Sequence, residues 1–417
     1  MIWLLLIGLF LLIYQPLAMW QMRGEFPLLS VYTVCLTFIW VFSWFLNPNQ
    51  RLLDNILIKA IFVYSLAITL STLFSSYTDV LQSYHFQAWA GYVLFFVILM
   101  TTAKTDRDLK IAIIGLLVIY FLLMAHSYWY VCIGRFRFSQ GFERLTTASG
   151  TDPNYFATRI VCTLPLLFPM IALCKKYWHY LFILGYALLT VRIITFAGSR
   201  GALISLVALM ILFTLFSRYR FSGLPVVLLT LPLGWFFMPA QYQDRFRTIW
   251  DPTISRDADA SMQGRFSGFY DGLKIWTNNP LFGAGPGAAP RAGDIALGAH
   301  NLPGHIAGEL GTLGIITFSF LLLCFGINHY NIWRNYKYLQ EKKLGKEGLY
   351  CWRVSIVVMY GVAMLLLQGL SLQNAFEFLW IWLAAFHALA AVFLQERVTA
   401  AMQGKLLPSL PGIPARK

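Results

Sequence analysis

Long apolar segments recur along the chain, and they restrict the possible folds more than any other feature. The first one, residues 2–20, contains no charged side chain. Inside lipid only a helix or a closed barrel satisfies every backbone polar group, and a helix spans the apolar layer with about 20 residues. Barrel strands alternate apolar and polar residues, and these segments do not. The sequence therefore predicts an all-α polytopic membrane protein.

The composition supports the same fold class. Only 12% of the 417 residues are charged and 58% are hydrophobic, whereas soluble proteins are about 25% charged. The net charge of +14 comes from basic residues scattered between apolar segments, a distribution that orients membrane helices and does not form a groove for nucleic acid. No CxxC pair occurs among the six cysteines, so neither a disulfide framework nor a zinc site is expected.

Hydropathy predicts about twelve membrane-spanning helices in a single transmembrane domain, residues 1–417. The predicted spans are 2–20, 27–46, 56–75, 88–103, 109–132, 155–173, 180–196, 201–216, 224–238, 306–328, 354–372 and 377–394. Twelve spans place both termini on one side of the membrane. A loop subdomain containing short helices, residues 239–305, is predicted between the ninth and tenth spans.

Basic residues predict which side of the membrane the termini face. Loops on the side of the termini carry eighteen Lys and Arg residues, and the short loops on the other side carry five. Lys and Arg are enriched in short cytoplasmic loops. Both termini are therefore expected in the cytoplasm, and the loops 133–154 and 239–305 are expected outside.

The loop 239–305 combines basic residues with an apolar stripe. Arg265 and Arg291 belong either to a solvated face balanced by aspartates or to an anion site. A helix beginning near Gly264 is predicted, either on the membrane surface or packed against protein. Its stripe consists of Phe266, Phe269, Tyr270, Leu273 and Trp276.

A glycine-rich run at 280–287, PLFGAGPG, has the look of a phosphate cradle. No strand precedes it, and Pro286 interrupts the run before a helix could begin. A tight loop that re-enters the membrane is the better interpretation, and no nucleotide site is expected.

Polar residues also collect at the turn 196–202, between the seventh and eighth spans. Ser199 is expected to cap the eighth helix, which leaves Arg200 among free N–H groups that attract anions. The alternative is an arginine that anchors the span at the lipid headgroups. Arg159 and Arg192 are expected at the same membrane level, and arginines within spans are functional candidates.

A third polar group of residues, 299–311, precedes and begins the tenth span. Pro303 suits the first helical turn, and His305 and Glu309 are expected on one helix face, with His305 assigned to packing. His300 lies just before the helix, where an imidazole can exchange a proton near neutral pH. A metal site would need a third ligand, and HExxH is absent, so no metal is expected.

With these segments in order, the chain resembles bacterial O-antigen ligases and related Wzy-type polysaccharide polymerases. The resemblance depends on SRGA at 199–202, on GR at 264–265 with the following WxxNPLFGAGPG, and on HNxxxxxxxELGxxG from His300 to Gly314. The segment DPNYFA at 152–157 is also similar to this family. The motifs cover roughly residues 150–320.

The resemblance implies metal-independent glycosyl transfer at the periplasmic face of a Gram-negative inner membrane, without a nucleotide or other cofactor. The donor would be a glycan on undecaprenyl diphosphate and the acceptor the lipid A-core oligosaccharide. The implied roles are diphosphate binding for Arg200, Arg265 and Arg291, general base for His300 in an inverting displacement, and support from Glu309, Asn301, Asp152 and Asn154.

Three alternatives stay open at this point. Within the family, a polymerase or a protein O-oligosaccharyltransferase would use the same spacing of motifs. A transporter for the lipid-linked glycan is the alternative of a different class. Transporters place charge and broken helices near the membrane midplane, whereas the polar residues of this chain gather at the outer ends of the predicted spans.

Overall fold

The computed structural model describes most residues of the chain. These are 1–14, 28–46, 55–77, 84–135, 137–139, 142–145, 152–171, 174, 176–216, 232, 235–236, 238–251, 256–293 and 299–405. The polypeptide is mainly helical, as predicted, and it also contains a two-stranded antiparallel hairpin that the sequence analysis did not anticipate.

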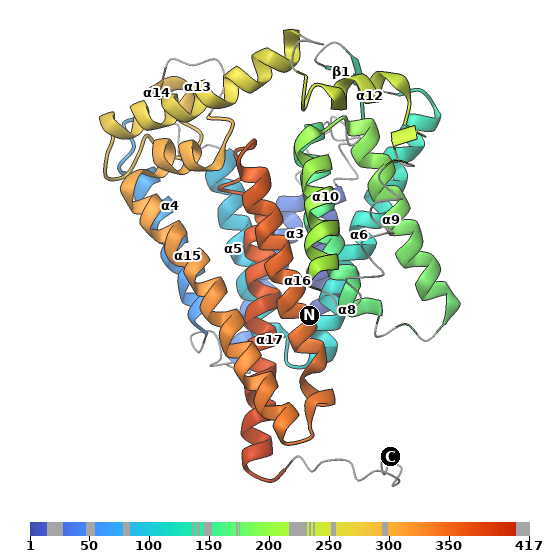
Figure 1. Cartoon of the computed structure of the whole chain (residues 1–417). Coiled ribbons are helices and arrows are strands. Elements are labelled where there is room, and N and C mark those ends of the chain that lie inside the picture. The colour runs from blue at the N-terminus through green and yellow to red at the C-terminus, as the bar shows by residue number, and fades with distance from the viewer. Residues whose placement is uncertain are drawn as a thin grey trace.

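Long helices run side by side between two ends of the molecule (Figure 1). The elements are α1 (Ile2–Tyr14), α3 (Leu28–Leu46), α4 (Ile56–Leu73), α5 (Tyr84–Thr102), α6 (Asp106–Cys132), β1 (Arg137–Ser139), β2 (Phe142–Arg144), α7 (Pro153–Thr163), η3 (Leu164–Leu166), α8 (Leu167–Ile171), α9 (Tyr177–Ala197), α10 (Arg200–Leu215), α12 (Ala240–Arg247), α13 (Arg256–Asn278), α14 (Ala289–Ala292), α15 (Leu302–Glu341), α16 (Gly345–Gly369) and α17 (Phe378–Met402). The end that carries α12, α13 and β1 is called the α13 end below.

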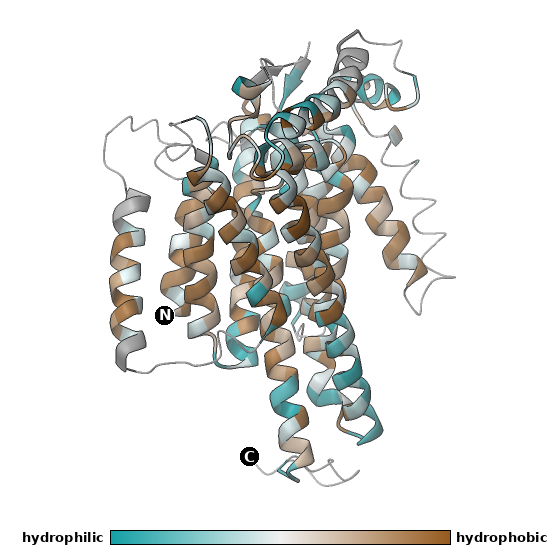
Figure 2. Ribbon diagram, turned by 90° about the vertical axis from the view of Figure 1, so that its left-hand side faces the viewer, coloured by the Kyte–Doolittle hydropathy of each residue, from teal (hydrophilic) through white to brown (hydrophobic). Residues whose placement is uncertain are grey.

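The described helices agree with a polytopic membrane protein. Eight of them are long and apolar enough to cross a membrane, and three shorter apolar helices correspond to the predicted first, second and eighth spans. The predicted ninth span, 224–238, lies almost entirely outside the described residues, so the total of twelve remains a prediction. Figure 2 shows apolar residues through the middle of the bundle and polar residues toward its two ends.

Helix α17 forms the centre of the bundle. It packs against α4, α5, α6, α15 and α16, and its apolar part is buried almost throughout. A helix that is apolar on all sides is expected in such a position. Its one imidazole is buried: His387 Nε2 lies 2.7 Å from Ser355 Oγ, while Nδ1 has no hydrogen-bond partner among the described residues. Asn328 Nδ2 donates to the backbone carbonyl of His387 at 3.1 Å. Polar pairs of this kind join helices within an apolar layer.

Helix α15 is broken near the α13 end, and the glycine-rich run fills the break. Gly311 has φ 65° and ψ −160° inside the helix. The amides of Ala284 and Gly285 donate to the carbonyls of Gly308 and Glu309, each at 2.9 Å. A Cβ on Gly283 would lie 2.4 Å from the Glu309 carbonyl carbon. The run is a tight loop in direct backbone contact with α15, and its entry into the membrane remains a prediction.

Helix α13 packs on the start of α15 through glycines. A Cβ at Gly268 would lie 2.3 Å from the Ala299 carbonyl oxygen, and one at Gly272 would lie 2.4 Å from that of Gly304. A helix is therefore present here, but it begins at Arg256 and not near Gly264. Its predicted stripe is divided between two faces, since Trp276 Nε1 donates to Thr312 Oγ1 of α15 at 3.1 Å. Phe266 and Tyr270 are 65% and 67% exposed, because the close backbone approach turns the glycine face inward.

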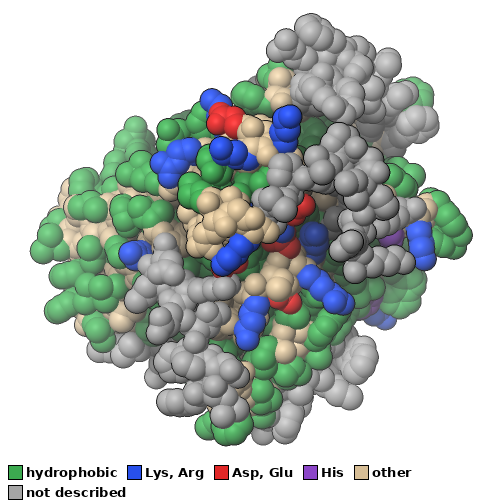
Figure 3. Space-filling view, turned by 90° about the horizontal axis from the view of Figure 1, so that it is seen from below, with side chains coloured by type: hydrophobic (Ala, Val, Ile, Leu, Met, Phe, Trp, Pro, Cys, Tyr) green, Lys and Arg blue, Asp and Glu red, His purple; other side chains and the backbone are tan. Residues whose placement is uncertain are grey.

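Lysines and arginines gather at the end opposite to α13, which Figure 3 views directly. The exposed basic side chains there come from the α5–α6 connection and from the region where α15 ends and α16 begins. They include Lys104, Arg107, Arg334, Lys337, Lys342, Lys343 and Lys346.

Matched alanine substitutions on α13 test the glycine packing. We expect Gly272→Ala to destabilise the protein by about 2 kcal/mol, because a new methyl group must displace the backbone of α15. Gly264→Ala on the same helix has no atom within 4 Å of the new Cβ and should be neutral or slightly stabilising, by up to about 1 kcal/mol. Thermal unfolding of the purified variants measures both effects, and equal midpoints would contradict the packing.

Candidate functional site

The turn between α9 and α10 places an arginine at the start of a helix. Gly198 ends α9 in the left-handed conformation, with φ 58°, and Ser199 Oγ accepts a hydrogen bond from the Ala202 amide. Arg200 is then the first residue of α10. A cation is unfavourable there for the helix, since the N-terminus is the positive end of the peptide dipoles. The same arrangement favours a bound anion.

Hydrogen bonds join this turn to β2, to the residue after β2, and to α12 with its C-terminal cap. The last carbonyls of α9 and its cap accept from the Leu145 amide at Phe196 (2.9 Å), from Arg144 Nε at Ala197 (2.8 Å) and from Arg245 Nε at Gly198 (2.6 Å). Arg200 Nη1 donates to Thr248 Oγ1 at 2.9 Å. Three arginines, from β2, α10 and α12, therefore converge on one turn.

Arg144 links this turn to the predicted DPN segment. Its side chain is 1% exposed, and its Nη2 donates to Asn154 Oδ1 at 2.8 Å. Asp152 caps the following helix by accepting from the Asn154 amide at 2.8 Å. Burial lowers the pKa of the Arg144 guanidinium to about 10; the nearby Asp152 carboxylate opposes the shift, and the like charge of Arg200 adds to it. The structure thus brings Asp152 and Asn154 to the Arg200 turn through Arg144.

The start of α15 holds the second group of candidate residues. His300 is partly buried and has φ 50°, a left-handed conformation that is unusual for a residue other than glycine and is often found at functional sites. Asn301 caps α15 by accepting from the Gly304 amide at 2.8 Å, and its Nδ2 donates to the Ala299 carbonyl. The local geometry of His300 is therefore determined by the residues on either side of it.

Glu309 connects α15 to the glycine-rich loop. One of its oxygens, Oε2, lies 3.1 Å from His305 Nε2 and accepts from the Gly287 amide at 2.7 Å. Both side chains are almost fully buried, and the ring of Phe376 packs edge-on against His305 with 5.0 Å between ring centroids. His305 thus has the surroundings of a packing residue, and Glu309 holds the loop against the helix.

The end of α16 lies between the first turns of α10 and α15. A Cβ on Gly201 would lie 2.9 Å from Ser371 Oγ and 3.1 Å from Gln368 Oε1. A Cβ on the adjacent Gly369 would lie 2.8 Å from Leu302 Cβ. The start of α10, with Arg200, and the start of α15, two residues after His300, therefore flank the same short segment. Sequence reasoning missed this segment, because no motif marks residues 368–371.

Other predicted arginines have different surroundings. Arg291 is exposed in α14, where it lies over the Tyr77 ring and close to the Gly287 carbonyl. Arg265 is part of α13, but its side chain lies outside the described residues. Arg159 forms a bidentate ion pair with Glu377, at 2.9 and 3.2 Å. This ion pair accounts for the partial burial of the Arg159 side chain. Arg192, by contrast, is exposed.

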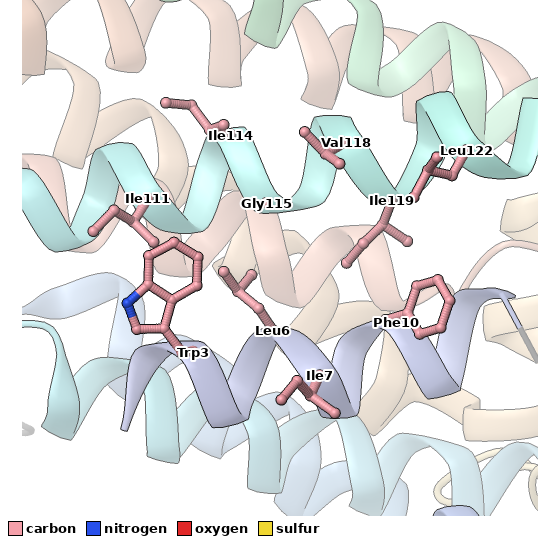
Figure 4. Close-up of a pocket in the computed structure, with 10 residues that line it drawn as sticks. All are labelled: Trp3, Leu6, Ile7, Phe10, Ile111, Ile114, Gly115, Val118, Ile119 and Leu122. Atoms are coloured by element: carbon pink, nitrogen blue, oxygen red, sulfur yellow. The ribbon is translucent and has the colours of Figure 1, made fainter.

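Two further features bear on what the site could hold. Among the described residues, no group of three or more His, Cys, Asp or Glu side chains is placed to hold a metal ion. A groove of about 470 Å³ lies between α1 and α6, lined by apolar residues such as Trp3, Phe10 and Val118 (Figure 4). The groove offers no charged group to a diphosphate, so the candidate site remains at the α13 end.

Comparison with known families finds a match in the middle of the chain. Residues 185–319 match the family model described as O-antigen ligase. This part of the chain is therefore similar to an O-antigen ligase domain. The matched interval contains the α9–α10 turn, α13, the glycine-rich loop and the start of α15. Members of the O-antigen ligase family are membrane glycosyl-transferring ligases, which supports a ligase or polymerase type of function. A search of curated proteins finds no match to the chain.

Removal of the Glu309 carboxylate tests its role in holding the loop. We expect Glu309→Ala to cost about 3–5 kcal/mol, because it leaves the buried His305 imidazole and the half-buried Gly287 amide without their acceptor. Glu347→Ala, at the exposed start of α16, is the control and should change stability by less than about 0.5 kcal/mol. Hydrogen exchange should also accelerate at Gly287 in the Glu309 variant. Unchanged exchange there would show that Glu309 does not hold the loop.

Proposed function

We propose that this protein is an O-antigen ligase that transfers a glycan from undecaprenyl diphosphate to the lipid A-core oligosaccharide. The observation that carries the proposal is Arg200 at the first turn of α10, within the region that matches the ligase family. A cation at that position is costly for the helix alone and suits a diphosphate, whose oxygens accept from both the guanidinium fork and helix N–H groups.

The proposed reaction is a single displacement at the anomeric carbon of the donor sugar. The acceptor hydroxyl oxygen forms the new glycosidic bond, the bond from the anomeric carbon to the diphosphate oxygen breaks, and undecaprenyl diphosphate leaves with its electron pair. Arg200 and Arg265 stabilise the charge that develops on the leaving group, and Arg291 is a weaker third ligand. His300 takes the hydroxyl proton, and the configuration inverts. No metal or nucleotide is required.

Supporting roles follow from the contacts of the remaining residues. Asn301 caps the helix directly after His300, and Glu309 holds the glycine-rich loop beside the same helix start. Asp152 and Asn154 act on the Arg200 turn by way of Arg144. None of these four residues is proposed to exchange a proton with the substrate.

We further propose that the α13 end faces the periplasm, so that both termini are cytoplasmic in a Gram-negative inner membrane. The basic side chains at the opposite end support this orientation, because Lys and Arg favour short cytoplasmic loops. Residues 239–305 would then form the periplasmic loop subdomain of a single transmembrane domain, accessible to a lipid-linked donor and to the lipid A-core acceptor.

Cysteine labelling tests the orientation. In a cysteine-free background, Ser261→Cys in α13 should react with a membrane-impermeant thiol reagent added to intact spheroplasts. Lys342→Cys, at the end of α15, should react only after the membrane is permeabilised. The reverse pattern would overturn the proposed topology.

Substitution of the two histidines at the start of α15 tests the proposed base. We expect His300→Ala to lose about 10²–10⁴-fold in transfer rate while it retains folding and donor binding. His305→Ala should lose much less transfer per folded molecule, because His305 is buried between Phe376 and Glu309. Transfer and donor-binding assays on purified protein separate the two effects. A parental transfer rate in His300→Ala would remove His300 as the base.

A further inference from the structure

Arg144 joins two external segments to the turn that carries Arg200, and neither the motifs nor the family match assigns it a role. Its Nε donates to the Ala197 carbonyl at the end of α9, and its Nη2 donates to Asn154 at the start of α7. The backbone of the next residue, Leu145, binds the neighbouring carbonyl of Phe196. The end of β2 is thus fixed to the last turn of α9 at two successive carbonyls.

The position of Arg144 is unusual for a residue with only a structural task. A nearly fully buried guanidinium is expensive. The Asp152 carboxylate offsets part of this cost, and the like charge of Arg200 adds to it. Arg245 adds a third guanidinium at the next carbonyl, that of Gly198. Three guanidiniums around the positive end of one helix favour an anion bound at that helix start.

We propose that Arg144 is a positioning residue for diphosphate binding. It holds the α9–α10 turn in place so that Arg200 and the first N–H groups of α10 bind the same anion. The inference rests on the proposed function and adds a residue to it. Because Arg144 is buried, it acts through Arg200 and does not touch the substrate. A positive charge alone would not fix the turn, because the side chain must donate one hydrogen bond to Ala197 and another to Asn154.

A lysine at this position separates geometry from charge. Lysine keeps the positive charge but offers a point donor in place of the planar fork, so Arg144→Lys cannot make both hydrogen bonds in the same way. We expect this variant to bind the diphosphate about tenfold more weakly. Arg135→Gln is the matched control: it removes an exposed arginine of the same connection that contacts Tyr130 and not the turn. Its affinity should stay within about twofold of the parent.

The experiment measures binding of farnesyl diphosphate, a short prenyl diphosphate, to the full-length protein in nanodiscs by calorimetry. The variants are Arg144→Lys, Arg200→Lys and the double variant. If Arg144 acts through Arg200, the double variant should bind no more weakly than Arg200→Lys alone, since coupled residues are not additive. Losses that add fully would mean that Arg144 acts independently, and would overturn the inference.

The remaining outcomes distinguish this inference from the proposed function. Parental affinity in Arg144→Lys, with affinity lost in Arg200→Lys, overturns the positioning role alone. No binding by the parent protein overturns the diphosphate site and the inference together. A lower unfolding temperature in Arg144→Lys with unchanged affinity would reduce Arg144 to a structural residue. If that variant does not fold, Asn154→Ala removes one acceptor of the fork, and parental affinity in that variant overturns the inference.

Discussion

A membrane interior offers no water to hydrogen-bond a backbone, and this constraint determines where chemistry can occur in this protein. Apolar segments must close their backbone hydrogen bonds within helices, so irregular turns and charges gather at the helix ends. At the α13 end, the first turn of α10 and the first turn of α15 both contact the end of α16. Polar groups such as Arg200 and His300 are therefore concentrated at this end by the requirements of the bundle itself.

Hydropathy was sufficient to predict the helical bundle, because segments such as 109–132 and 377–394 carry their own signal. It was not sufficient for the length of α15, which continues to Glu341 although the apolar run ends near residue 328. A hydropathy pattern predicts the part of a helix that faces lipid or the core. It does not predict how far the helix continues with polar residues beyond that part. The β1–β2 hairpin was missed for a similar reason, since three-residue strands leave almost no pattern.

The candidate site was predictable where its residues are neighbours in sequence. The Ser199 cap, Arg200 at the helix start, and the pairing of His305 with Glu309 all follow from local spacing. Arg144 lies 53 residues from the carbonyl that it binds, and the end of α16 is more distant still from α10. Such contacts depend on how helices assemble, and a single sequence contains no periodicity that reveals them.

The central claim is that this site transfers a lipid-linked glycan to lipid A-core, and a lipopolysaccharide gel from a strain lacking the protein tests it most directly. Ligation predicts core-only lipid A together with accumulated polymer on the lipid donor, and restoration by the parental gene but not by His300→Ala. A single added repeat on lipid A-core would instead identify a polymerase. Surface glycan identical to that of the parent strain would contradict the account.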